Sequence, residues 1–85
     1  MDSEIHYTSV KFYIANLKKI KEELSFYQTE YEPEKVRSLI SAYKFYISKI
    51  IEHGEQFLVK EKNDWPKLAE VEELVDKFKR FLSTL

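Results

Sequence analysis

Apolar side chains recur at alternating intervals of three and four residues in three successive stretches of the chain. This spacing places them on one face of an α-helix, which makes a turn about every 3.6 residues. It predicts helices at about residues 4–30, 33–59 and 65–84. The apolar seams comprise Val10, Tyr13, Leu17, Ile20, Leu24, Tyr27 and Tyr31 in the first stretch, Val36, Tyr43, Ile50 and Phe57 in the second, and Leu68, Val71, Val75, Phe78, Leu82 and Leu85 in the third.

Two prolines mark the starts of the second and third helices. Proline suits the first turn of a helix, where its missing amide is not needed, and it disfavours helix at the preceding residue. Pro33 therefore begins the second helix, and Pro66 lies in the first turn of the third, with Asp64 or Asn63 as the expected N-cap. Ser3 is the expected cap of the first helix.

Glycine is scarce, since Gly54 is the only one in the chain. A chain with so few turn-forming residues is not expected to form a sheet. Gly54 lies inside the second apolar pattern, where it either ends the helix early or admits a close neighbour. If the helix ends early, residues 57–59 could form a short extended segment.

The short connectors predict that consecutive helices pack antiparallel. We expect one domain, residues 1–85, with an all-α fold: an up-down-up three-helix bundle that a homodimer could complete. The charges agree with this antiparallel arrangement. Acidic and basic stretches alternate along the chain, so folding it at the connectors places stretches of opposite charge side by side. Folding the chain near Asn63 brings Glu70 beside Lys11, and it brings Lys77 towards Glu22.

Composition excludes several classes of protein. The chain has no cysteine, so it cannot form disulfides or thiolate metal sites, and it fits a reducing compartment. Its first residues are acidic and no long apolar run follows, so we expect no secretion signal, no membrane span and a cytoplasmic location. The net charge of −1 argues against binding nucleic acid by bulk electrostatics.

The sequence contains no motif that indicates catalysis. It has no glycine-rich phosphate loop, no zinc-protease helix and no nucleophile elbow. His6 and His53 would lie at the same end of the bundle, near Glu4, Glu52 and Glu55, but two such histidines are expected to be surface or capping residues. We therefore expect no enzyme, no metal and no cofactor.

Several large apolar residues lie off the seams. The tyrosines of the seams are expected to be core residues with hydroxyls at the surface, whereas the off-seam residues face solvent. Exposed aromatic side chains on separate helices indicate a contact surface. We expect a non-catalytic accessory or regulatory protein, or an inhibitor, that binds a larger protein or itself through Ile5, Phe12, Phe26, Phe45 and Trp65.

An alternative is a nucleic-acid-binding accessory module. Lysines bracket Phe12 and Phe45, and a mixture of bases and aromatic rings is typical of single-strand binding. Nearby acidic residues compete for these lysines. The residues of this alternative are Lys11, Lys18, Lys19, Lys21, Lys44 and Lys49.

Overall fold

The structure is a computed structural model that describes residues 2–30 and 32–84, with the side chains of all of these except residues 2 and 28–30. It contains the helices α1 (Asp2–Glu30), α2 (Pro33–Lys60) and α3 (Trp65–Ser83), and the described residues form no strand. The predicted helices are confirmed, each beginning and ending within two residues of its expected position. Tyr31 and Leu85, expected to extend the seams, lie outside the described residues.

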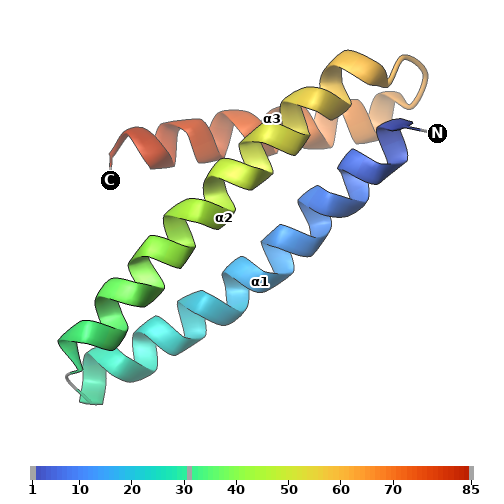
Figure 1. The fold of residues 1–85 in the computed structure, drawn as a ribbon. Coiled ribbons are helices and arrows are strands. Elements are labelled where there is room, and N and C mark those ends of the chain that lie inside the picture. Colours follow the sequence, from blue (N-terminus) through green and yellow to red (C-terminus); the bar gives the residue numbers. More distant parts are fainter. Residues whose placement is uncertain (1, 31, 85) are drawn as a thin grey trace.

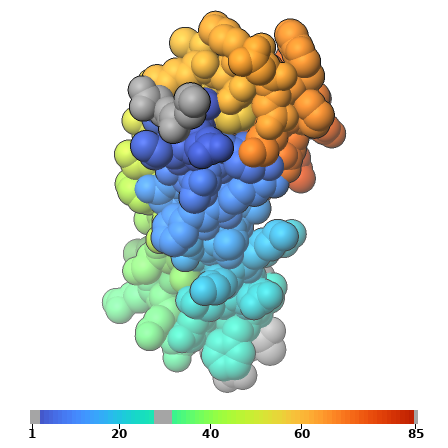
Figure 2. Space-filling model, turned by 90° about the vertical axis from the view of Figure 1, so that its right-hand side faces the viewer, coloured from blue at the N-terminus to red at the C-terminus, as the bar shows by residue number. Residues whose placement is uncertain are grey.

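The predicted three-helix bundle is also confirmed. Helices α1 and α2 form a long antiparallel hairpin, and α3 crosses α2 obliquely (Figure 1). Helix α3 starts near the beginning of α1 and then diverges from it. Figure 2 looks onto α1, with α2 on its left and the start of α3 at the upper right. Helix α3 therefore packs mainly on α2 and much less on α1.

The core consists of two apolar clusters. The first joins all three helices, and its buried members are Val10, Leu17, Ile47, Ile50 and Phe78. The second lies where the end of α2 meets the start of α3, and its buried members are Phe57, Val71 and Val75. Seven of the eight belong to the predicted seams, and Ile47 lies three residues before Ile50 on the same face of α2, so the apolar periodicity identified these buried residues.

Gly54 lies inside α2 and admits a close neighbour. The helix continues through it to Lys60, so residues 57–59 are helical and the extended alternative is wrong. Gly54 is buried, and a Cβ atom built on it would overlap Cγ2 of Val75 and lie 3.4 Å from Cγ1 of Val71. The absent side chain is what allows α3 to pack directly against the backbone of α2.

The residues expected to start or cap the helices are confirmed for α2 and α3 but not for α1. Pro33 begins α2, and the side chain of Asp64 caps α3 by accepting a hydrogen bond from the Lys67 amide at 3.2 Å. The expectation that Ser3 caps α1 is wrong, because α1 already begins at Asp2. Ser3 is buried instead, and its hydroxyl donates a hydrogen bond to Oε1 of Glu61 at 2.7 Å.

None of the helices in the described part of the chain has both the length and the apolar character that a membrane span requires.

Candidate protein interface

The five side chains predicted to bind a partner are all exposed. The exposed fractions are 64% for Ile5, 61% for Phe12, 59% for Phe26, 54% for Phe45 and 73% for Trp65. The bundle therefore leaves these large apolar groups in water, as the off-seam positions predicted. Their exposure alone does not make a site, so their mutual arrangement decides which of them can act together.

Phe12 and Phe45 are joined into one continuous surface by two tyrosines. The Phe12 ring contacts Tyr13 edge to face at 5.5 Å between centroids, and Phe45 contacts Tyr46 in the same way at 5.6 Å. Tyr13 and Tyr46 then meet across the two helices at 5.6 Å. We call this row, which runs Phe12–Tyr13–Tyr46–Phe45 from α1 to α2, the aromatic strip.

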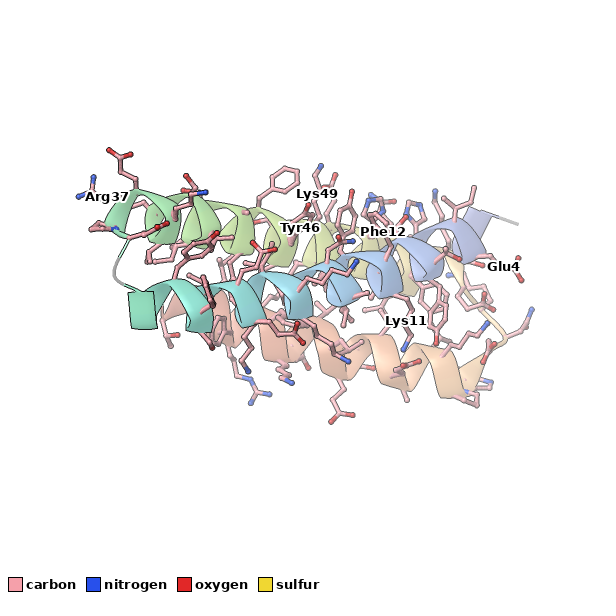
Figure 3. All side chains as sticks on the ribbon, turned by 90° about the horizontal axis from the view of Figure 1, so that it is seen from below. Glu4, Lys11, Phe12, Arg37, Tyr46 and Lys49 are labelled. Carbon is pink, nitrogen blue, oxygen red and sulfur yellow. The ribbon has the colours of Figure 1, made fainter. Side chains whose placement is uncertain are left out.

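The position of the strip follows from helix geometry. Tyr13 and Tyr46 are half-buried residues at the contact between α1 and α2. The preceding residue on each helix lies about 100° further round, which turns Phe12 and Phe45 from the contact towards solvent. In Figure 3, Phe12 and Tyr46 lie on the side of the hairpin away from α3, whereas Lys11 points towards α3.

An ion pair and an imidazole border the strip. Lys49 lies over the Phe45 ring, with its Nζ atom 5.6 Å from the centroid, and it also forms an ion pair with Glu52 at 3.2 Å. His53 stacks on Tyr13, the ring next to Phe12 in the strip, with 5.8 Å between ring centroids. The strip is thus an uncharged aromatic surface bordered by a compensated ion pair and an imidazole.

The remaining three predicted residues lie apart from the strip's centre. Ile5 is seven residues before Phe12 on α1, about 10 Å along the helix and on nearly the same face. Phe26 is 14 residues beyond Phe12, about 21 Å along the helix, where it contacts only its neighbour Tyr27 among the ring pairs of the described residues. Trp65 starts α3 and lines a separate recess with Leu68.

The lysines of the nucleic-acid alternative do not share one face. Lys11 points towards α3 and forms an ion pair with Glu70. Lys18 and Lys21 line a groove of about 600 Å³ between α1 and α3. Lys49 lies on the other side of the hairpin (Figure 3), beside the strip. The other two, Lys19 and Lys44, are exposed.

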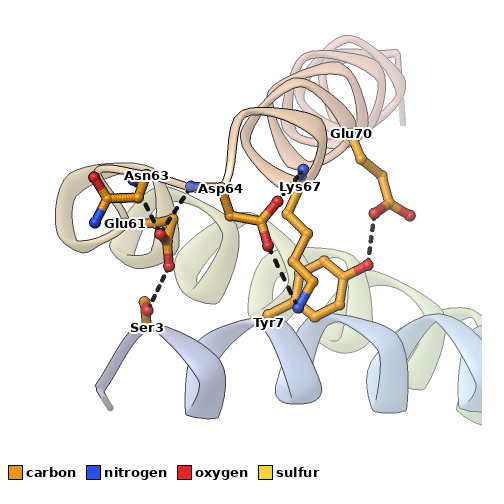
Figure 4. A network of polar contacts seen from close by, with 7 residues as sticks. All are labelled: Ser3, Tyr7, Glu61, Asn63, Asp64, Lys67 and Glu70. Atoms are coloured by element: carbon orange, nitrogen blue, oxygen red, sulfur yellow. Dashed lines mark hydrogen bonds and ion pairs between the residues drawn. The ribbon is translucent and has the colours of Figure 1, made fainter.

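A polar network fixes the connector between α2 and α3 (Figure 4). The Glu61 carboxylate accepts hydrogen bonds from the amides of Asn63 and Asp64 at 3.1 and 3.0 Å, besides the one from Ser3. The Ser3 hydrogen bond, followed by those of the two amides, holds the pKa of Glu61 below its ordinary value. One carboxylate thus joins the start of α1 to the turn before α3.

A second polar cluster joins α1 to α3. The Tyr7 hydroxyl donates to Oε1 of Glu70 at 2.6 Å, and Lys11 forms an ion pair with the same carboxylate. The Lys11 hydrogen bond, then that of Tyr7, lowers the pKa of Glu70. The shared hydrogen bonds to Glu70 raise the pKa of both Tyr7 and Lys11. The charge pattern of the sequence predicted the Lys11–Glu70 pair. It also placed Lys77 near Glu22, but in the described part of the chain no ion pair joins these two residues, because α3 diverges from α1.

Sequence reasoning missed the part that Tyr13 and Tyr46 play in the strip. It treated them as core residues with surface hydroxyls, and they are indeed half-buried, but they also connect Phe12 to Phe45. The available signal was the Phe-Tyr dipeptide, which α1 carries twice, at residues 12–13 and 26–27, and α2 carries once, at residues 45–46. It shows which rings are neighbours within a helix, but not which of these pairs meet across the two helices.

Within residues 2–30 and 32–84, no group of three or more histidine, cysteine or acidic side chains is arranged to hold a metal ion. His6 and His53 do meet at the end of the hairpin, as their positions in the bundle suggested. No family model matches the chain, and no curated protein or solved structure matches it either.

Proposed function

We propose that this chain is a non-catalytic interaction protein, an accessory or regulatory subunit that binds a larger protein through the aromatic strip. The observation that supports this most is the continuity of the strip. Four rings follow one another at 5.5 to 5.6 Å, and the two outer rings are more than half exposed. We further propose that it acts in the cytoplasm, since a chain without cysteine suits a reducing compartment.

The strip has the physical properties of a binding hot spot. Aromatic side chains dominate interface energies because they bury large areas with few rotatable bonds. Covering the exposed part of one phenyl ring, about 100 Å², contributes roughly 2.5 kcal/mol at 25 cal/mol per Å². The half-buried tyrosines support Phe12 and Phe45 from behind, so little side-chain entropy is lost when a partner covers them.

The shape and charge of the strip favour a separate protein with an apolar groove. Its outer rings project from the surface, so a second copy would set projecting rings against projecting rings, over an area small compared with the roughly 800 Å² per partner of a stable interface. A concave partner would enclose both rings. The scattered lysines and the compensated Lys49–Glu52 pair give no continuous basic path for a nucleic-acid strand.

The experiment compares a strip variant with a matched control. The strip variant is Phe12→Ser/Phe45→Ser, and the control is Phe26→Ser, which removes an equally exposed phenyl ring from α1 outside the strip. Each protein is immobilised and incubated with lysate of its own source, and the captured proteins are quantified by mass spectrometry. Circular dichroism and light scattering verify the helicity and the mass of each variant.

We expect wild type and Phe26→Ser to capture the same partner in equal amounts. In a titration with that purified partner, the strip variant should bind at least about a hundredfold more weakly. Equal loss in the strip variant and the control would overturn the proposal. If wild type is a dimer, the strip variant is a monomer, and both capture the same other proteins, then the strip mediates self-association. That result would overturn the proposal of a separate partner.

A further inference from the structure

The groove of about 600 Å³ between α1 and α3 lies on the side of the hairpin away from the aromatic strip (Figure 3). Its apolar lining comes from all three helices and consists of Ile14, Leu17, Tyr43, Leu74, Phe78 and Phe81. Leu17 and Phe78 belong to the core, whereas the Phe81 ring is 41% exposed and contacts Tyr43 at 5.8 Å between centroids. The divergence of α3 from α1 thus leaves apolar surface partly uncovered.

The charged side chains of the groove are mostly lysines. Four lysines and two glutamates line it, a net charge of +2 in a chain whose net charge is −1. Among the described residues, Lys18, Lys21 and Lys77 form no ion pair, and neither does Glu73. The three unpaired lysines lie on both walls, two on α1 and one on α3, so the groove attracts anions.

The two ends of the groove differ in width and in charge. At one end the Lys11–Glu70 ion pair joins α1 to α3 and compensates both charges. Lys18 and Lys21 lie about 10 and 15 Å further along α1, and Lys77 lies about 10 Å beyond Glu70 along α3. The groove is therefore narrow at the ion pair, and it is wide and basic where α3 diverges.

We propose that this groove binds the anion of a fatty acid. The carboxylate lies at the wide end, among Lys18, Lys21 and Lys77, and the acyl chain covers the apolar lining towards the Lys11–Glu70 pair. A single-chain amphiphile thus matches both the apolar lining and the positive charge. The length of about 15 Å accommodates an extended chain of about 12 carbons, at about 1.2 Å per bond.

The size of the groove favours an acyl chain over a helix of a partner protein. A helix about 10 Å across would occupy about 1,200 Å³ over the same length, twice the volume of the groove. It would also have to separate α1 from α3 at the narrow end, where Glu70 binds both Lys11 and the Tyr7 hydroxyl. An acyl chain reaches this end without breaking either contact.

The test measures binding of octanoate and laurate to the whole chain by titration calorimetry, below the concentration at which either forms micelles. The groove variant is Lys18→Gln/Lys21→Gln. The matched control is Lys19→Gln/Lys44→Gln, which removes two exposed lysines outside the groove and changes the net charge equally. A third variant, Glu73→Gln, removes the unpaired acidic group from the groove.

We expect wild type to bind laurate at least about tenfold more tightly than octanoate, because each half-covered methylene group contributes about twofold. The groove variant should bind laurate at least about fivefold more weakly, and the control should stay within about twofold of wild type. Glu73→Gln should bind more tightly, since it removes a repulsive charge. No binding of laurate, or equal loss in the groove variant and the control, would overturn the proposal.

A second measurement on the wild type avoids any effect of the substitutions on folding. In nuclear magnetic resonance spectra, laurate should shift the methyl signals of Ile14, Leu17 and Leu74 most, and shifts confined to the residues of the aromatic strip would overturn the groove as the site. Two other occupants would also overturn it. These are a second copy, shown by a dimer that the groove variant dissociates, and a membrane, shown by binding to phosphatidylglycerol vesicles without binding of free laurate. Phe12→Ser/Phe45→Ser should bind laurate like wild type, so this result is independent of the partner of the strip.

Discussion

Replacing Gly54 with alanine adds one methyl group where α3 packs on the backbone of α2. At an exposed position this change would stabilise a helix by about 1 kcal/mol, because glycine is a poor helix former. Here the new Cβ atom would overlap Cγ2 of Val75. Valine has one strongly preferred rotamer in a helix, so the side chain cannot easily turn away, and α3 itself has to shift.

The expected result is a net loss of stability. Overpacking of a filled core costs about 1–3 kcal/mol, which exceeds the gain in helix propensity. Taking about 2 kcal/mol for the overpacking and about 1 kcal/mol for the gain in helix propensity, we expect Gly54→Ala to lower the free energy of unfolding by about 1 kcal/mol, a decrease in melting temperature of roughly 4–8 °C for a domain of this size. Urea unfolding followed by circular dichroism measures the free energy directly.

A double-mutant cycle with Val75→Ala identifies the cause. Val75 is 3% exposed, and its truncation alone should cost about 2 kcal/mol by leaving a cavity. In that background the added methyl group at position 54 has room, so Gly54→Ala should become neutral or stabilising, with a coupling energy of about 2 kcal/mol. If Gly54→Ala stabilises the wild type, or has the same effect in both backgrounds, the close packing of α3 on Gly54 is refuted.

Three further predictions concern single side chains, each measured by urea unfolding. Asp64→Ala should cost about 1 kcal/mol through loss of the α3 cap, whereas Asn63→Ala should change stability by less than about 0.5 kcal/mol; equal effects would contradict the cap. Glu70→Gln should cost at most about 1 kcal/mol at pH 7, because its ion pair is partly exposed. Because the pKa of Glu70 is lowered, this stabilisation is present above the ordinary pKa of 4.5 and is lost as the pH falls through the pKa of the folded state. The free energies of unfolding of wild type and variant should therefore converge in acid, and a difference that stays constant with pH would refute this role of Glu70. Phe12→Ser should leave the free energy of unfolding within about 0.5 kcal/mol of wild type, since a larger loss would show that Phe12 belongs to the core.

The fold was predictable because local rules determine most of it. Apolar periodicity defined the helices, Pro33 and Pro66 placed two of their starts, and Asp64 was available to cap the third. Ser3 was misassigned because a serine near a helix start can satisfy the helix amides or reach a distant group, and only the tertiary structure shows that Glu61 is within reach. Periodicity also cannot give the direction in which α3 diverges from α1.

The candidate site was predictable only residue by residue. The heptad positions of Phe12 and Phe45 showed that both rings would be exposed, and the topology placed His6 near His53. Whether Phe12 connects to Phe45 depends on the rotation and the longitudinal register of two helices, which packing determines to within a few ångströms. The same register separates Phe26 from the strip and sets the 2.9 Å between the two imidazoles.

Among the helices of the described residues, α2 is the one that both of the others pack along, and this predicts the order in which the helices separate. Helix α3 can swing away from Gly54 while α1 and α2 stay paired, but α2 cannot be released without separating both partners. Amide hydrogens in the middle of α2 should therefore exchange with solvent deuterium most slowly, through global unfolding alone. Those of α3 should exchange sooner, through a partial unfolding that leaves the aromatic strip intact.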